Sequence, residues 1–195
     1  MKKIPVAQPN LIGNEKDYVL DCMNTTWISS AGKYVQDFES EFARFCGTKY
    51  AASCCNGTAA LHLALMALGI SERDEVIIPA LTYIATCNAV KYVNAKPVFA
   101  DIDPNTWNID PAKIEEKITK KTRAIIVVHL YGNPADMDSI MSVAKKHNLY
   151  VIEDAAEAHG ALYQGKKAGS IGDIGTFSFF GNKLITTGEG GMVVT

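Results

Sequence analysis

The chain has 195 residues, of which 48% are hydrophobic and 21% are charged, so its composition is that of an ordinary globular protein rather than of a disordered or collagen-like one. The formal net charge of -2 and the isoelectric point near 6.1 provide neither the basic surface that nucleic acids require nor an acidic tail. No uncharged apolar run approaches the roughly 18 residues that a membrane span needs, and "MKKIPVAQPN" lacks the apolar core of a secretory signal. We therefore expect a cytoplasmic protein that acts on small neutral or anionic metabolites and binds neither nucleic acid nor membranes.

The cysteines and histidines predict no covalent or metal framework. The five cysteines are odd in number and include no C-x-x-C pair, and the four histidines show no metal-ligand spacing. We therefore expect reduced thiols, with neither a set of disulfides nor a metal site.

The first predicted element is a helix over residues 34–47, in which Phe38, Phe42 and Phe45 recur on one face. Beyond it, short apolar runs rich in β-branched residues alternate with helix-like segments. Two helices are predicted over residues 57–69, ending at Gly69 as a cap, and over residues 136–148. The strand candidates are residues 50–54, 75–80, 96–102, 124–130, 149–155, 175–180 and 191–195.

Several of these runs are apolar on both faces, as expected for strands of a parallel sheet that helices cover on both sides. The alternation of strands and helices predicts an α/β protein built as a three-layer α/β/α sandwich. Ligands of such sheets bind at the carboxyl ends of the strands. The residues that follow each run are therefore the candidates for a functional site.

The first candidate position is the start of the helix that follows residues 50–54. Gly57 and Thr58 open this helix, whose free N–H groups and dipole attract an anion, and a glycine lets a phosphate approach the backbone closely. The alternative is that Asn56 and Thr58 are simple helix caps. The pattern alone allows both interpretations.

The second candidate is Asp154, which ends the run "LYVIED". A carboxylate buried at the end of a central strand is costly unless it meets a cation or several donors, so a positively charged partner is expected. The alternative is an acidic cap for the segment "AAEAHG" that follows.

The third candidate is Lys183 in "FSFFGNKLITTGEGG", between an aromatic run and a glycine-rich turn. A desolvated lysine at the ligand-binding edge would be a nucleophilic amine that forms an imine with a carbonyl group, whereas an isolated loop lysine would face solvent. Together, an anion site, a buried carboxylate and an amine are the three fixtures that hold pyridoxal 5'-phosphate.

The motifs that carry these residues resemble, in the same order and over nearly the whole chain, those of the DegT/DnrJ/EryC1/StrS sugar aminotransferases. The matching segments are "NGTAALHLAL", "VIIPALTYIATCNAV", "PVFADID", "VVHLYGNPADM", "VIEDAAEAHGA" and "GSIGDIGTFSFFGNKLITTGEGGMVVT". The resemblance implies a type I pyridoxal-phosphate fold: an aspartate aminotransferase-like large domain with a mostly parallel seven-stranded sheet. Within the group, "NTTWISSAGKYVQDFESEFARFCGTKYA" and "FFGNK" are most similar to the members that make GDP-perosamine.

By this resemblance, Lys183 is the catalytic lysine that forms the Schiff base with the cofactor and acts as general base. Asp154 is the partner of the cofactor's ring nitrogen. Tyr83, in "LTYIAT", occupies the aromatic position that stacks on the cofactor ring, although an ordinary aromatic residue at a helix start would look the same.

The resemblance also assigns cofactor-binding positions around the phosphate and the ring hydroxyl. Gly57, Thr58 and Ser178 match the phosphate-binding positions, and Glu157 stands near the ring hydroxyl, where many relatives have glutamine.

The remaining candidates are substrate residues in the early segment and one histidine. Trp27, Ser29 and Ser30 are candidates to approach the substrate. His159, in "EAHGA", is expected to pack or to form a hydrogen bond rather than to catalyse.

The implied reaction is the transfer of an amino group from L-glutamate to a 4-keto-6-deoxy sugar nucleotide, with GDP-4-dehydro-6-deoxy-D-mannose giving GDP-perosamine as the favoured case. One alternative is a deoxysugar-nucleotide dehydratase of the same fold, although those proteins have histidine where Lys183 stands. The other is a non-catalytic member of the family that acts as a binding or interaction module.

The family's members are longer than this chain, so residues 1–195 are expected to comprise an N-terminal segment and most of the cofactor-binding large domain, without the small C-terminal domain. The complete protein is expected to be a homodimer with the cofactor at each interface. The 195-residue chain alone is expected to aggregate and to have little or no activity.

Overall fold

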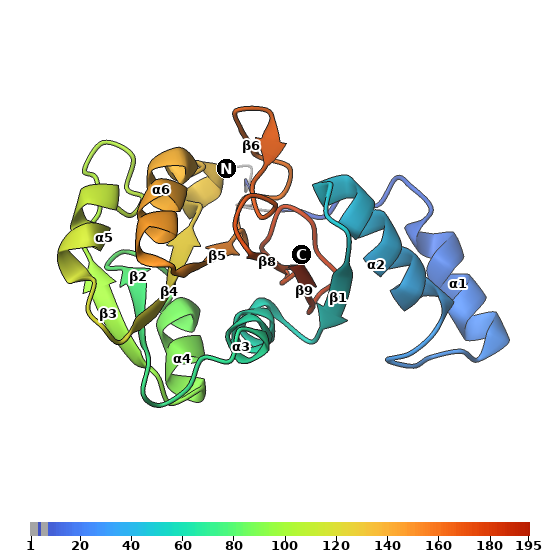
Figure 1. Ribbon diagram of the computed structural model, residues 1–195. Helices are drawn as coiled ribbons and strands as arrows, with labels where there is room; N and C mark the ends of the chain where they lie inside the picture. The colour runs from blue at the N-terminus through green and yellow to red at the C-terminus, as the bar shows by residue number, and fades with distance from the viewer. Residues whose placement is uncertain (1–3, 5–7) are drawn as a thin grey trace.

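The computed structural model of the protein describes residue 4 and residues 8–195, and its centre is a seven-stranded sheet (Figure 1). Across the sheet the strands lie in the order β1-β9-β8-β5-β4-β2-β3. Each of the seven predicted runs overlaps one of them, although β4 and β8 begin before their predicted runs. The strands are β1 (Ala51–Cys54), β2 (Glu75–Pro79), β3 (Lys96–Ala100), β4 (Thr122–Val128), β5 (Tyr150–Asp154), β8 (Ile174–Ser178) and β9 (Gly191–Val194).

The sheet is mostly parallel, as predicted, with one reversed strand. β3, β2, β4, β5 and β8 pair in parallel, whereas β9 is antiparallel to both of its neighbours, β8 and β1. Three strands end two residues earlier than predicted: β3 at Ala100, β4 at Val128 and β8 at Ser178.

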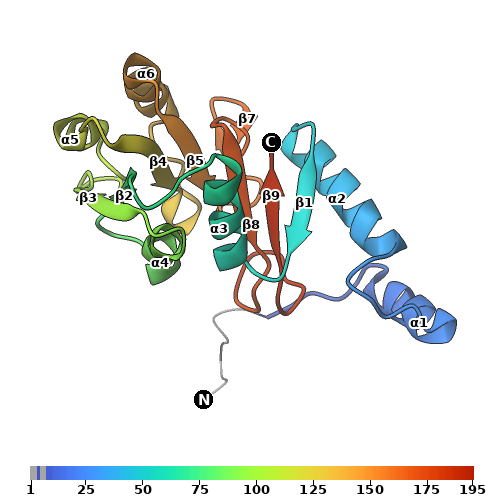
Figure 2. The ribbon, with the colours of Figure 1, turned by 60° about the horizontal axis from the view of Figure 1, so that its bottom comes forward.

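Helices cover both faces of the sheet, which confirms the three-layer sandwich (Figures 1 and 2). On one face, α3 and α4 pack on a core that includes Val76, Ile126 and Ile152. On the other face, α5 and α6 pack near Ile125 and Val151, and α2 packs beside them on β8 and β9. The helices are α1 (Glu15–Thr25), α2 (Lys33–Cys46), α3 (Gly57–Ala67), α4 (Ile84–Tyr92), α5 (Pro111–Lys117) and α6 (Met137–His147), with a 3-10 turn η1 (Leu130–Gly132).

Several features were given no range by the sequence analysis: α1, α4, the short helix α5, the turn η1, and a hairpin of β6 (Leu162–Tyr163) and β7 (Lys166–Lys167). The hairpin turns at Gln164 and Gly165, which both have positive φ, so its "QG" dipeptide is a turn signal that pattern analysis could have used. α1 contains no buried residue and projects beyond the β1 edge of the sheet (Figure 2).

The structure also describes the cysteines, the apolar length of the helices and the grouping of potential metal ligands. All five cysteines are free thiols. Within the described part of the chain, no helix is both long enough and apolar enough to cross a membrane, and no cluster of three or more potential ligands could hold a metal ion.

Candidate functional site

The candidate site is a cavity of about 360 Å³ at the carboxyl ends of β4, β5 and β8, beneath the starts of α3 and α4. A larger and more open hollow of about 560 Å³ lies at the opposite edge of the sheet, around Thr122 and Leu149, and contains none of the candidate residues. The cavity brings together all seven residues that the sequence assigns to the cofactor: Gly57, Thr58, Tyr83, Asp154, Glu157, Ser178 and Lys183.

One wall of the cavity is the start of α3, where the backbone approaches β8. The Asn56 side chain accepts a hydrogen bond from the Ala59 amide at 2.9 Å, so Asn56 caps the helix while the amides of Gly57 and Thr58 have no partner within the helix. A Cβ atom on Gly57 would lie 2.7 Å from the Cβ of Ser178, so only glycine allows this approach. The two interpretations of the sequence are therefore compatible: a capped helix start that also presents N–H groups to an anion.

The floor of the cavity carries the carboxylate of Asp154, a residue of which only 7% is exposed. It accepts hydrogen bonds from the Thr86 hydroxyl at 3.0 Å and from the Ala156 amide at 3.3 Å. Burial raises the pKa of Asp154, and these hydrogen bonds and the charge of Lys183 offset only part of that effect. No cation among the described residues forms an ion pair with Asp154, so these residues do not supply the positive partner expected from the sequence.

Thr86 was missed by the sequence analysis, although a position signal existed. It lies three residues after Tyr83 on the first turn of α4, and it reaches Asp154 across 68 positions of the chain. A hydroxyl on the first turn of a helix that follows a buried strand is a residue type to search for at such a site.

Lys183 lies in the loop between β8 and β9, and its side chain is only 18% exposed. Its Nζ lies 3.5 Å from Oε1 of Glu157. The other oxygen of Glu157, Oε2, accepts the Tyr131 amide at 2.8 Å. Glu157 therefore joins the lysine to the turn that follows β4, a link that the sequence did not predict.

Tyr83 lies at the rim, immediately before α4, with 75% of its surface exposed. Its side chain makes no capping hydrogen bond to the helix, so capping does not explain its presence there. Its ring is free to stack on a flat ligand in the cavity.

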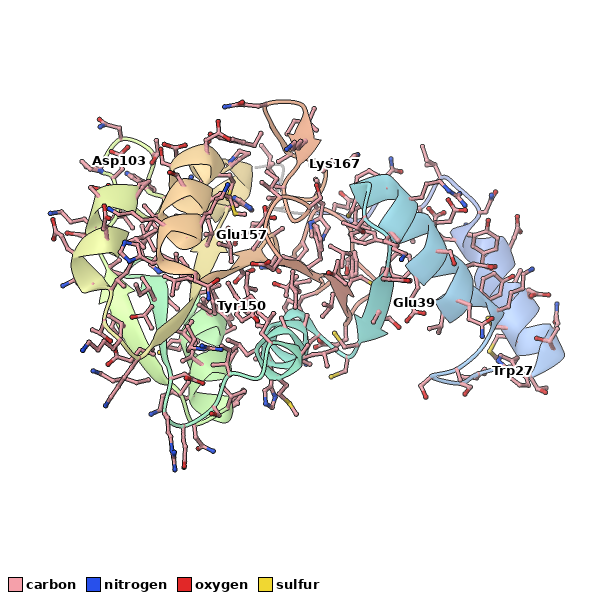
Figure 3. The ribbon with its side chains drawn as sticks, in the orientation of Figure 1. Trp27, Glu39, Asp103, Tyr150, Glu157 and Lys167 are labelled. Atoms are coloured by element: carbon pink, nitrogen blue, oxygen red, sulfur yellow. The ribbon has the colours of Figure 1, made fainter. Side chains whose placement is uncertain are left out.

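Trp27 and Ser29 are not among the residues that line the cavity. Trp27 donates its indole N–H to the Ala31 carbonyl, and the Ser29 hydroxyl accepts the Ala31 amide, so both side chains bind their own loop between α1 and α2. Figure 3 shows Trp27 at the outer end of this helix pair, away from Glu157. Their loop lies beyond the edge strand β1, outside this chain's own cavity, and their approach to the substrate stays a prediction.

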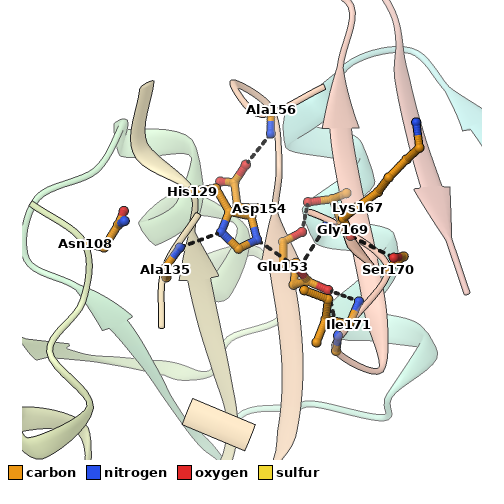
Figure 4. Close-up of polar contacts among 12 residues, drawn as sticks. Asn108, His129, Ala135, Glu153, Asp154, Ala156, Lys167, Gly169, Ser170 and Ile171 are labelled. Atoms are coloured by element: carbon orange, nitrogen blue, oxygen red, sulfur yellow. Dashed lines mark hydrogen bonds and ion pairs between the residues drawn. The ribbon is translucent and has the colours of Figure 1, made fainter. Parts of the chain in front are cut away.

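Behind the cavity, on the other face of the sheet, a buried polar network ties three segments together (Figure 4). Glu153, next to Asp154, is fully buried and accepts the amides of Gly169, Ile171 and Gly172 at 2.8, 2.6 and 2.6 Å. It also pairs with Nε2 of His129 at 2.9 Å. Burial works to raise the pKa of Glu153, but the contacts with His129 and the amides outweigh it, and the net pKa is lowered.

The tautomer of His129 follows from its second contact. The Ala135 amide donates to Nδ1 at 3.1 Å, so Nδ1 carries no proton and Nε2 donates to Glu153. The network therefore fixes the ends of β4 and β5 and the loop before β8, the same strands that carry the site. The sequence analysis did not identify it.

His159 packs, as the sequence analysis expected. Its ring lies 5.4 Å from the rings of both Phe177 and Phe179, and burial lowers its pKa to about 4. These phenylalanines belong to the core beneath α2, and His159 is not among the residues that line the cavity.

Chemically, the cavity can hold an anion at the start of α3 and a cation at Asp154, and it presents the amine of Lys183 between them. This is the set of contacts that a phosphorylated, positively charged ring with a carbonyl substituent requires.

Comparison with known proteins agrees with this arrangement. GDP-perosamine synthase of Caulobacter vibrioides is 62% identical over 195 residues, which are 100% of this chain and 53% of that protein, so the chain spans about half the length of this relative. The aminotransferase of Psychrobacter cryohalolentis superposes with a TM-score of 0.92 at 48% identity, covering 96% of this chain and 48% of that one. GDP-4-keto-6-deoxy-D-mannose-3-dehydratase of E. coli, a structure with bound hydrated PLP, superposes with a TM-score of 0.92 at 33% identity, covering 100% of this chain and 51% of that one.

A family model spans nearly the whole sequence. It matches residues 9–195, and those residues include every residue that lines the cavity. The chain belongs to the DegT/DnrJ/EryC1/StrS aminotransferase family.

Proposed function

We propose that the protein containing this chain is a pyridoxal-phosphate-dependent aminotransferase that moves the amino group of L-glutamate to a 4-keto-6-deoxy sugar nucleotide. The observation that carries the proposal is the convergence of Lys183, Asp154 and the α3 start on one cavity. The favoured acceptor is GDP-4-dehydro-6-deoxy-D-mannose, which would become GDP-perosamine. That choice is supported by the 62% identity to a relative named GDP-perosamine synthase.

The residues present fit pyridoxal 5'-phosphate. Asp154 is a buried carboxylate without a cationic partner among the described residues, as a site for a protonated ring nitrogen requires. The amides of Gly57 and Thr58 at the start of α3 have no partner within the helix and form a cradle for an anion. A Cβ atom on Gly57 would collide with Ser178, so this cradle requires the glycine. When bound, the cofactor supplies a carbonyl carbon that bonds to amines and a ring that withdraws electrons from the adjacent carbon.

The roles of the chain's own residues follow from their positions. Asp154 keeps a proton on the ring nitrogen, because its carboxylate is buried and a cation there relieves the cost of its charge. Lys183 Nζ removes the α-proton of L-glutamate and later delivers a proton to the sugar carbon that receives the amino group. Glu157 Oε1, 3.5 Å away, is placed to hold the lysine's ammonium form between these steps.

The bound ring would be enclosed from two sides. Tyr83 stacks on it from the rim, and Gly57, Thr58 and Ser178 bind its phosphate at the α3 start. The products are 2-oxoglutarate and a 4-amino-4,6-dideoxy sugar nucleotide.

The dehydratase alternative rests on a likeness of fold to the E. coli enzyme. Lys183 argues against it, because an amine at this position suits proton transfer in both halves of an amino exchange. The non-catalytic alternative is less well supported, since the cavity retains an amine, a buried carboxylate and an anion site together.

The proposal extends to the organisation of the protein. Residues 1–195 are taken as an N-terminal segment and most of the large domain, with the small domain in the remaining half of such proteins. The complete protein is taken as a cytoplasmic homodimer.

The test is an assay of the complete protein with cofactor, L-glutamate and a panel of 4-keto sugar nucleotides. We expect formation of the amino sugar nucleotide with at least one acceptor, the GDP sugar being the best. Turnover restricted to 2-oxo acids, or release of a deoxygenated keto sugar without amine, would contradict the proposal.

A further inference from the structure

Tyr131, in the turn after β4, has a backbone conformation that its side chain disfavours. Its φ and ψ are 50° and 30°, in the left-handed region. A residue with a Cβ atom pays about 1–2 kcal/mol for that conformation, which glycine adopts freely. The surrounding contacts must therefore enforce it.

The contacts that enforce this conformation come from two distant segments. Glu157 Oε2 accepts the Tyr131 amide at 2.8 Å. Asn108, which is 3% exposed, accepts the Leu130 amide with Oδ1 at 3.1 Å and donates from Nδ2 to the Asn133 carbonyl at 3.0 Å. The backbone is thus fixed on both sides of Tyr131.

Packing of the ring does not explain the strain. Tyr131 is 80% exposed, and within the described part of the chain its hydroxyl has no hydrogen-bond partner. A strained backbone that holds out an unsupported aromatic ring points to a function for the ring.

The position of the ring indicates which ligand it meets. Glu157 accepts the Tyr131 amide with one oxygen and approaches Lys183 Nζ with the other. Leu130, the residue before Tyr131, lines the cavity, so the exposed residue Tyr131 lies next to the cavity wall on the side of the reacting amine. The cavity of about 360 Å³ is at the small end of ligand sites, which span roughly 300–1,000 Å³. Once a cofactor occupies it, only the reacting part of a nucleotide sugar fits inside, and the nucleotide extends over the rim.

We infer that the Tyr131 ring stacks on the nucleobase of the acceptor and so contributes to specificity for a nucleotide-linked sugar. The inference rests on the proposed function. The amino donor, L-glutamate, has no ring for Tyr131 to contact, so the residue should act in the acceptor half of the reaction alone.

The test is a titration of GDP into the cofactor-loaded complete protein, by calorimetry, for the wild type and four variants. Tyr131→Ala and Tyr131→Gly both remove the ring, but only glycine also relieves the strain. Tyr131→Phe keeps the ring, and Tyr50→Ala removes an exposed aromatic residue outside the cavity.

We expect the dissociation constant of GDP to rise at least about 5-fold in Tyr131→Ala and Tyr131→Gly, the lower bound for losing one base–aromatic stack. Tyr131→Phe and Tyr50→Ala should stay within about 2-fold of the wild type. The KM for the acceptor should rise in parallel, while the spectroscopically measured half-reaction with L-glutamate should stay within about 2-fold in every variant.

Equal GDP affinity in the wild type and in both ring-deleting variants, or no binding of GDP by the wild type, would overturn the inference. Loss of affinity in Tyr131→Ala alone would also overturn it, since that result assigns the effect to the backbone. A wild type that does not exchange its amino group with L-glutamate would instead count against the proposed function.

Discussion

At the scale of single residues, Asp154 connects stability with function. Burial raises the pKa of Asp154, so folding favours its protonated form. The stability that this group contributes is complete below the pKa of an unfolded aspartate, about 3.9, and is lost as the pH rises through the raised value. A cation at the carboxylate, such as a protonated ring nitrogen, would restore the stability that the protein loses when Asp154 ionises.

We predict that Asp154→Asn stabilises the cofactor-free protein at pH 7–8 by about 1–3 kcal/mol, because it removes the cost of a buried carboxylate that its hydrogen bonds and the charge of Lys183 only partly offset. The gain should shrink as the pH falls toward about 3.9. The same variant should bind the cofactor more weakly. Urea unfolding between pH 4 and pH 8 measures the first effect, and a variant that is less stable than the wild type at neutral pH would contradict it.

Residues of the site differ in how far the sequence predicts them. Asp154 and Lys183 were predicted because each follows an apolar run at the ligand-binding edge of the sheet. Thr86 and Tyr131 were not, because what distinguishes them is a contact with Asp154 or Glu157 from a distant segment. Trp27 and Ser29 were predicted from similarity of motif alone, which does not say on which side of the β1 edge a loop lies.

At the scale of elements, the start of α3 depends on its close approach to β8. A Cβ atom on Gly57 would lie 2.7 Å from Ser178 Cβ, a separation that forces the helix start or the strand end to move. We predict that Gly57→Ala lowers cofactor affinity by about 10-fold or more, since the amides of the cradle shift. Titration with pyridoxal 5'-phosphate measures the effect. Gly13→Ala, whose added Cβ meets only the flexible Glu15 side chain, is the matched control and should bind normally.

The buried network around Glu153 also holds neighbouring elements together, because it joins the ends of β4 and β5 to the loop before β8. The pKa of Glu153 is lowered, so its contribution to stability is present above the unfolded value of about 4.3 and is lost as the pH falls through the folded value. We predict that Glu153→Gln costs about 2–4 kcal/mol at pH 7, because an amide nitrogen would face backbone N–H groups that now meet a carboxylate.

The measurement is urea unfolding together with amide hydrogen exchange at Gly169, Ile171 and Gly172, which should lose protection in Glu153→Gln. The control is Glu116→Gln, which breaks only an exposed pair with Lys113 and should change stability by less than about 0.5 kcal/mol. Unchanged stability of Glu153→Gln at pH 7 would show that the network does not hold the strands.

The elements themselves were largely predictable from the sequence. The five inner strands show as apolar runs because they are buried almost throughout, whereas the edge strands β1 and β3 are only partly buried. The prediction differs from the structure mainly at the strand ends. The reversal of β9 could not be read from the sequence, because an apolar run has no direction. α1 was missed; none of its residues is buried in the described chain, so it lies outside the alternation of strands and helices that builds the core.

At the scale of the whole molecule, α1 is the least supported element. It contains no buried residue, and four of its large apolar side chains are more than half exposed: Tyr18, Val19, Leu20 and Met23. Apolar side chains gathered on one helix are typical of a surface that another chain covers.

We predict that the complete protein is a dimer in sedimentation analysis and that Val19→Glu weakens the association by about 10-fold or more. Lys16→Glu on the same helix, which changes charge without removing an apolar contact, is the control. The 195-residue chain alone should sediment as a polydisperse sample with little or no activity. A monodisperse and active preparation of this chain would contradict the prediction.

The central claim is that the amine of Lys183 bonds to the cofactor in this cavity. Its most direct test is borohydride reduction of the protein loaded with pyridoxal 5'-phosphate, followed by peptide mass spectrometry. The account predicts one cofactor mass per chain on the peptide that contains Lys183, and none there in Lys183→Ala. Visible cofactor absorbance with the reduced cofactor on another lysine, or on none, would contradict the account.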